Sequence, residues 1–114
     1  MHLKRIHMLL ALVACGAIAA PTMALASGGQ AAATHTVTLK NFGFHAATLS
    51  IHRGDSVTWL WRDGGVEHNV TGAHFHSHTM GSGSYTVRFT HAGTFNYHCT
   101  IHVSLGMKGK IVVH

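Results

Sequence analysis

The stretch from Tyr85 to Cys99, which reads YTVRFTHAGTFNYHC, contains two runs of alternating side chains around a short turn. The odd-numbered positions of the first run are tyrosine, valine and phenylalanine, and those of the second run are phenylalanine, tyrosine and cysteine. Side chains alternate between the two faces of a strand, so each run predicts a strand with one apolar face. The glycine-containing turn THAGT predicts that the chain reverses here, and the alternation leaves Cys99 on the core-facing side.

Similar runs occur in other parts of the chain. Residues 36–39 (TVTL) alternate, residues 47–61 (ATLSIHRGDSVTWLW) contain two alternating runs around a turn, and short strands are predicted at residues 68–71 and 110–113. A long polar connection is expected over residues 73–83, and no segment has a convincing helical pattern. Short strands separated by glycine-rich turns predict an all-β protein with the architecture of an antiparallel β-sandwich. The two tryptophans of residues 47–61 share a strand face and are expected in its core.

Residues 1–26 have the pattern of a secretory signal peptide. Two basic residues precede an apolar run, and residues 24–26 (ALA) supply the small side chains that a signal peptidase recognises. The run is interrupted by Pro21 and is too short for a membrane-spanning helix. We therefore expect cleavage before Ser27, export to the periplasm, and no stable insertion in a membrane.

A lipoprotein signal is the alternative interpretation of the same segment. Residues 12–16 (LVACG) resemble a bacterial lipobox, in which Cys15 would carry the lipid and become the first mature residue. The cysteine comes early and the apolar stretch continues beyond it, so the ordinary signal peptide is favoured. Residues 27–34 are then a flexible leader, and residues 35–114 form one domain that we expect to be a monomer.

The composition of the mature chain limits the classes of function that it could have. Removal of the first 26 residues leaves 88, among which Cys99 is the only cysteine. A disulfide within the mature chain is thus excluded, and one unpaired thiol in an exported protein suggests a metal ligand. Six Lys or Arg residues stand against three carboxylates, scattered without a dense run or interleaved aromatic residues. Nucleic-acid binding therefore finds no support, although a mildly basic surface suits an acidic partner.

Cys99 begins the stretch CTIHVSLGM, which has the spacing C-x2-H-x4-M through His102 and Met107. A fourth group can come from His68 in the separate segment EHNVT. Two histidines and a cysteine with a distant methionine form a soft donor set typical of an electron-transfer copper site. A zinc site is less suited, because methionine is a poor zinc ligand. A buried structural cysteine is the simpler alternative, but it leaves the order and spacing of the four groups unexplained.

These segments resemble those of the cupredoxins, the small blue copper proteins, and most closely those of the plastocyanin and pseudoazurin group. The resemblance extends over nearly the whole mature domain and includes NFGFHAATLSIHRGDSVTWLW, EHNVT, GSYTVRFTHAGTFNYHC and GMKGKIVV. It implies a Greek-key β-sandwich of the cupredoxin type with one copper ion per chain. By position, the implied copper ligands are His68, Cys99, His102 and Met107.

The resemblance also implies supporting residues, a function and partners. Asn69 would tie the two ligand segments together by hydrogen bonding to Thr100, with its N–H directed at the thiolate. The protein would cycle between Cu(II) and Cu(I) without transforming a substrate. It would carry single electrons between redox proteins, such as a c-type cytochrome or a copper- or haem-containing reductase or oxidase. The expected docking patch for these transient partners is apolar and comprises His102, Val103, Leu105 and Met107.

The histidine-rich stretch HFHSH suggests a function beyond electron transfer. His74, His76 and His78 alternate, so an extended segment would place them on one side as a possible secondary metal site. A solvated loop is the plainer interpretation. If these histidines bind copper, the protein would instead be a periplasmic copper storage or delivery protein. A copper enzyme would need an open coordination position or a second copper, which a closed four-ligand site does not provide.

Overall fold

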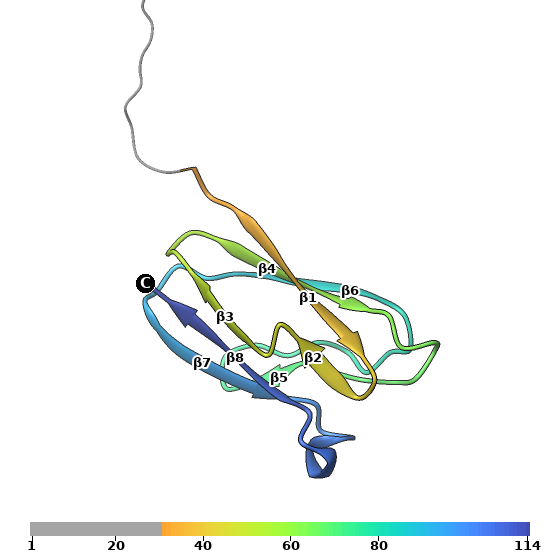
Figure 1. The fold of residues 1–114 in the computed structure, drawn as a ribbon. Helices are drawn as coiled ribbons and strands as arrows, with labels where there is room; N and C mark the ends of the chain where they lie inside the picture. The colour runs from red at the N-terminus through yellow and green to blue at the C-terminus, as the bar shows by residue number, and fades with distance from the viewer. Residues whose placement is uncertain (1–30) are drawn as a thin grey trace, which may run out of the picture. The chain divides into compact units, whose positions relative to one another are not determined.

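The computed structural model describes residues 31–114, so the predicted signal peptide (1–26) and the alternative lipid site at Cys15 lie outside the described residues. In this part of the chain eight strands form two four-stranded sheets, with the orders β2-β1-β4-β6 and β3-β8-β7-β5 (Figure 1). The elements are β1 (Thr34–Lys40), β2 (Gly43–His45), β3 (Thr48–Ile51), β4 (Ser56–Trp61), β5 (Thr71–Gly72), β6 (Gly83–Arg88), β7 (Gly93–His98), the short 3-10 helix η3 (Val103–Leu105) and β8 (Lys108–Val113). The predicted all-β sandwich is confirmed. No helix within residues 31–114 is long and apolar enough to span a bilayer.

Each sheet contains one parallel pair, so the sheets are mixed and not purely antiparallel as predicted. β1 runs parallel to β4, with Val37 opposite Trp59, and β3 runs parallel to β8, with Leu49 opposite Ile111. The other neighbouring strands are antiparallel. Alternation reveals which face of a strand is buried, but it does not reveal which strand lies beside it. Here the chain leaves the first sheet after β2, forms β3 in the second, and returns to place β4 beside β1.

The core lies between the two sheets and is rich in aromatic rings. In β4 the buried and partly buried positions alternate strictly, and Trp59 and Trp61 are buried as expected. The Trp59 ring meets Tyr97 of the other sheet nearly at right angles, with ring centroids 5.3 Å apart. Phe44 of β2 also packs edge-on against Tyr97, at 4.7 Å. Such edge-to-face contacts add to the stabilisation from burial and join the two sheets.

The strand predicted at residues 68–71 is present only in part. Thr71–Gly72 forms β5 and pairs with β7, whereas His68 forms an isolated bridge with Met80. In that bridge each residue donates its N–H to the carbonyl of the other, at 3.0 and 3.1 Å. The polar connection after β5 thus folds back and supplies the backbone partners that a neighbouring strand would otherwise provide. This bridge holds the backbone of His68 in place.

The turn between β1 and β2 consists of Asn41 and Phe42, since Lys40 already pairs with Gly43. Both turn residues have positive φ, 52° and 57°. Two-residue hairpin turns commonly need this backbone to match the twist of their strands. For asparagine it is familiar, but for a bulky residue such as phenylalanine it is a genuine outlier. The turn brings Phe42 to the end of the sandwich where the predicted ligands lie.

Candidate metal centre

His68 is completely buried at the end of the sandwich. Besides the bridge to Met80, its carbonyl accepts a hydrogen bond from Trp61 Nε1 at 3.1 Å. Because Trp61 is the last residue of β4, this bond fixes His68 relative to the first sheet. The backbone that carries the imidazole is therefore held by hydrogen bonds to Met80 and to Trp61 at the end of β4, and it is not a free loop.

The other three predicted ligands lie on the connection between β7 and β8. The Cys99 N–H donates to the Met107 carbonyl at 3.1 Å, and the Leu105 N–H donates to the His102 carbonyl at 2.9 Å. Gly106 ends η3 with φ 84°, a conformation that a residue with a side chain rarely adopts. The connection is thus a hydrogen-bonded turn whose two ends are held by paired strands.

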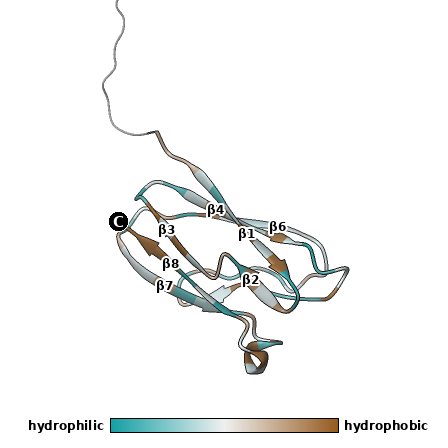
Figure 2. Ribbon diagram, viewed as in Figure 1, coloured by the Kyte–Doolittle hydropathy of each residue, from teal (hydrophilic) through white to brown (hydrophobic). Residues whose placement is uncertain are grey.

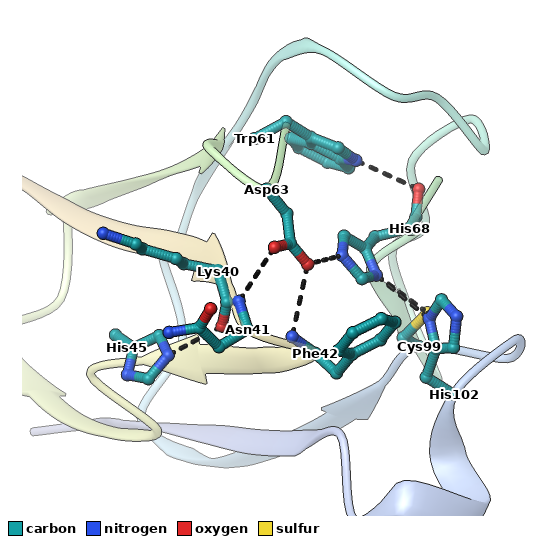
Figure 3. Close-up of polar contacts among 9 residues, drawn as sticks. All are labelled: Lys40, Asn41, Phe42, His45, Trp61, Asp63, His68, Cys99 and His102. Carbon is teal, nitrogen blue, oxygen red and sulfur yellow. Dashed lines mark hydrogen bonds and ion pairs between the residues drawn. The ribbon is translucent and has the colours of Figure 1, made fainter. Parts of the chain in front are cut away.

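His68, Cys99 and His102 converge at this end of the sandwich (Figure 3). The two histidine Nδ1 atoms are 3.1 Å apart, and Cys99 Sγ lies 3.9 Å from His68 Nδ1 and 3.7 Å from His102 Nδ1. Within residues 31–114 this is the only group of three His, Cys, Asp or Glu side chains with ligand atoms all within 4.8 Å. Donors bonded to one ion at about 2.0 Å for nitrogen and about 2.3 Å for sulfur lie about 3 to 4 Å apart. The spacing therefore fits one metal ion.

The chemistry of the three donors fits copper. Imidazole nitrogens suit Cu(II) and sulfur suits Cu(I), so the set can hold both oxidation states. His68 and Cys99 are completely buried, while His102 is partly exposed. The protein thus excludes water from two candidate donors and leaves the third, His102, near the surface. Bound copper would supply a one-electron Cu(II)/Cu(I) couple at this place.

Met107 is completely buried at the base of the ligand connection. Its N–H donates to the His102 carbonyl at 3.4 Å, and its carbonyl accepts the hydrogen bond from Cys99. The backbone of Met107 thus contacts two of the converging residues, and coordination by its sulfur stays a prediction. Met107 was expected in the exposed docking patch, and this expectation was wrong because its side chain is buried.

Exposed apolar side chains surround His102. Val103 and Leu105 were expected here, and the structure adds Ile101 and Phe42; Figure 2 colours the η3 segment as apolar. The Phe42 ring packs edge-on against the His102 ring, with centroids 4.9 Å apart. Sequence spacing could not reveal this contact, because Phe42 belongs to a distant turn. The apolar patch is defined by Phe42, Ile101, Val103 and Leu105, which are 43%, 47%, 37% and 66% exposed.

The hydrogen bonding expected between Asn69 and Thr100 is present. Asn69 Nδ2 donates to Thr100 Oγ1 at 2.8 Å, and Asn69 Oδ1 accepts from the Thr100 N–H at 3.0 Å. Nδ2 also donates to Thr79 Oγ1, and Oδ1 also accepts from Thr71 Oγ1, both at 2.9 Å. Since Asn69 and Thr100 each follow a buried candidate ligand, these bonds tie the two segments that carry His68 and Cys99 together. A bond from the Asn69 N–H to the thiolate stays a prediction.

Asp63 contacts the centre, although sequence reasoning did not identify it. One carboxylate oxygen accepts hydrogen bonds from His68 Nε2 at 2.7 Å and from the Phe42 N–H at 3.2 Å, and the other accepts from the Asn41 N–H at 3.0 Å (Figure 3). Burial disfavours the ionised carboxylate, but these bonds outweigh it and lower the pKa of Asp63. The only signal was an aspartate in RDGG, five positions before His68, and an ordinary turn has the same appearance.

The three histidines of HFHSH lie on the surface. His74, His76 and His78 are exposed and alternate with the partly buried Phe75 and the buried Ser77. Among the described residues, they do not form a group with ligand atoms as close as those of the metal centre. Metal binding by these histidines stays a prediction.

Comparison with known proteins relates both the fold and the site to copper-binding proteins. The family model for copper binding proteins of the plastocyanin/azurin family matches residues 31–114. Amicyanin from Paracoccus denitrificans is 34% identical over 88 residues, which cover 68% of this chain and 63% of amicyanin. Chloroplastic plastocyanin from Tetradesmus obliquus is 36% identical over 87 residues, which cover 61% of this chain and 57% of that protein. The chain therefore spans less than two thirds of the length of these two relatives.

Solved structures show the same architecture. A Cu(I) form of an amicyanin mutant matches with a TM-score of 0.64 and 29% identity, over 71% of this chain and 82% of that chain. A reduced Cu(I) amicyanin mutant at pH 4 matches with a TM-score of 0.63 and 29% identity, over 76% and 86%. The β-sandwich with a His–Cys–His group at one end defines a cupredoxin, as the sequence resemblance implied. The chain belongs to the plastocyanin/azurin family of copper-binding proteins.

Proposed function

We propose that the protein is an exported, periplasmic electron carrier with one type 1 copper ion held by His68, Cys99, His102 and Met107. The observation that carries the proposal is the convergence of one thiol and two imidazoles within 4.8 Å, on elements fixed by paired strands. Donors held in this way move little between the two oxidation states, so an electron can enter and leave without large rearrangement. The protein transforms no substrate and is not an enzyme.

The apolar patch supports transient docking at the copper end. His102 is the partly exposed member of the converging group, and the Phe42 ring touches it from the patch. A partner seated on the patch would approach the centre through the His102 ring. A small apolar contact favours rapid release, as an electron shuttle requires. The partners we propose are redox proteins, such as a c-type cytochrome or a copper- or haem-containing reductase or oxidase.

The charges of residues 31–114 favour an acidic partner. Asp55 is buried and Asp63 is largely so, and hydrogen bonds hold both, which leaves Glu67 as the exposed carboxylate. Six exposed cations face solvent: Lys40, Arg53, Arg62, Arg88, Lys108 and Lys110. Such a surface speeds encounter with a negatively charged protein, and the effect weakens as salt screens the charges.

The proposal is tested with the mature protein and one equivalent of Cu(II). We expect an intense visible thiolate-to-copper band, narrow copper hyperfine splitting in EPR, and a stoichiometry of one. A reduced c-type cytochrome should bleach the band by transferring one electron. Cys99→Ser should abolish the band, whereas His76→Ala should leave it unchanged. A pale spectrum that survives Cys99→Ser and is lost in His76→Ala would reject the carrier assignment, and a stoichiometry above one would favour copper storage or delivery.

A further inference from the structure

We propose that Asp63 is a positioning residue of the copper centre, which orients His68, holds the Phe42 ring against the ligands and favours Cu(II) over Cu(I). The proposal rests on the proposed function, with His68 and His102 as copper ligands. It adds a charged group, from a loop outside the ligand segments, to the determinants of the reduction potential.

The first step concerns the orientation of the His68 imidazole. An imidazole has two nitrogens, and the hydrogen bond at one of them decides which is free to bind a metal. Asp63 accepts from His68 Nε2 at 2.7 Å, while Nδ1 lies 3.1 Å from His102 Nδ1 and 3.9 Å from Cys99 Sγ. The His68 side chain is 0% exposed and that of Asp63 is 12% exposed. The carboxylate therefore holds the proton on Nε2 and leaves the Nδ1 lone pair directed at the site.

The second step concerns the turn between β1 and β2. The same carboxylate accepts from the N–H groups of Asn41 and Phe42, the two residues with positive φ. A phenylalanine in this conformation needs surrounding structure to hold it there. The Phe42 ring lies nearly perpendicular to both imidazoles, with centroids 4.9 Å from His102 and 6.0 Å from His68. One side chain thus orients one ligand directly and covers both ligands through the turn (Figure 3).

The third step concerns charge. A carboxylate hydrogen-bonded to a ligand makes that ligand a stronger donor and lies close to the metal in a largely dry environment. Within residues 31–114, the ion-pair partner of Asp63 is His68 and no Lys or Arg pairs with it. The nearby Arg62 donates instead to the Trp61 carbonyl at 3.2 Å. The negative charge of Asp63 therefore favours the more positive Cu(II) state, which lowers the reduction potential.

The experiment compares Asp63→Asn and Asp63→Ala with Glu67→Gln. The control removes one negative charge from the residue next to His68, but Glu67 is exposed and makes no side-chain hydrogen bond to a described residue. Cu(II) and Cu(I) affinities are measured by competition with chelators, together with the reduction potential. We expect the Cu(II) affinity of Asp63→Ala to fall by about 10- to 100-fold. Cu(I) affinity should fall less, so the potential rises in both Asp63 variants and stays near wild type in Glu67→Gln.

The outcomes separate this role from general destabilisation. A merely structural Asp63 would lower the affinities for both oxidation states equally, with an unchanged potential, and that result would overturn the proposal. So would equal behaviour of Asp63→Asn and Glu67→Gln. If Asp63→Ala fails to fold, as circular dichroism of the copper-free protein would reveal, Asp63→Asn alone decides, since it keeps the size of the side chain.

The contact with Phe42 has its own measurement. In the diamagnetic Cu(I) protein, nuclear Overhauser effects between the Phe42 and His102 rings should be present in wild type and in Glu67→Gln. They should weaken in Asp63→Ala, and their persistence would refute the positioning of Phe42 by Asp63. Absence of the blue band in the wild-type protein would instead contradict the proposed function.

Discussion

At the scale of single residues, Asn69 shows how a buried amide can set the distance between two parts of a site. Its side chain uses both Nδ2 hydrogens and accepts two hydrogen bonds at Oδ1, although Asn69 is only 5% exposed. Three of the four bonds reach side-chain hydroxyls, and the fourth comes from the Thr100 backbone. A full set of partners removes the cost of burying the amide and makes one arrangement of the ligand segments preferred.

Asn69→Ala should therefore destabilise the copper-free protein. The change removes four hydrogen bonds and leaves three threonine hydroxyls and the Thr100 N–H without this partner in a partly buried region. We therefore expect a loss of about 2–4 kcal/mol in the free energy of unfolding. Urea denaturation of the copper-free protein measures the loss. Thr86→Ala is the control, because it removes only the exposed hydroxyl bond to Thr58 and should cost less than about 1 kcal/mol. Similar losses in the two variants would contradict a special role for the Asn69 amide.

At the scale of elements, a glycine in β8 makes room for a buried ring of β7. Tyr97 of β7 pairs with Gly109 of β8 on one side and with Gly72 of β5 on the other. A Cβ built on Gly109 would overlap the Tyr97 ring. Tyr97 is 2% exposed, and burial raises the pKa of its hydroxyl to about 12. Gly109 therefore serves the packing of Tyr97 on the sheet face next to Cys99.

Gly109→Ala should destabilise the sandwich by overpacking. Because the new methyl group meets a ring held between two sheets, we expect a loss of about 1–3 kcal/mol in the free energy of unfolding. Gly43→Ala is a matched change in another strand, where the nearest atom to the new Cβ would be 3.5 Å away, an ordinary contact. Thermal unfolding of both copper-free variants should show a clear drop in the first and little change in the second. An equal drop would mean that loss of glycine itself, not the clash with Tyr97, is responsible.

At the scale of the whole molecule, Asp55 links the start of the first sheet to the second. Its carboxylate accepts hydrogen bonds from the Ala33 N–H at 2.9 Å, from His35 Nε2 at 2.9 Å and from the His52 N–H at 3.1 Å. His52 directly follows β3, whereas Ala33 directly precedes β1 and His35 belongs to it. The hydrogen bond from Ala33, with those from His35 and His52, lowers the pKa of Asp55 from 3.8 to about 2.

This lowered pKa predicts a dependence of stability on pH. The ionised carboxylate is favoured in the folded state, so its contribution is fully present above about pH 4 and is lost as the pH falls from there towards 2. The urea midpoint of the copper-free protein should fall over this range. Asp55→Asn should lower the midpoint at pH 6 and flatten the fall, with a remaining slope from Asp63, whose pKa is also lowered. The same slope in Asp55→Asn and wild type would show that Asp55 does not contribute.

Much of the fold and part of the site could be predicted from local pattern. Alternation identified most of the strands but not β2, and it placed Trp59 and Trp61 in the core and Cys99 on the buried side. The prediction of a strand at residues 68–71 was mostly wrong, since only Thr71 belongs to a strand. His68 instead forms a bridge with Met80, which depends on a return of the chain that no local pattern reveals. The parallel pairs were missed for the same reason.

The sequence by itself determined which candidate metal donors the protein carries on one short connection, namely Cys99, His102 and Met107, because their order and spacing are local properties. Only the tertiary structure decided what surrounds them. Asp63 and Phe42 reach the centre from two separate loops, and the partner of a buried polar group depends on which strand ends meet in space. That meeting is governed by the packing of the two sheets across the core, which many distant residues determine together.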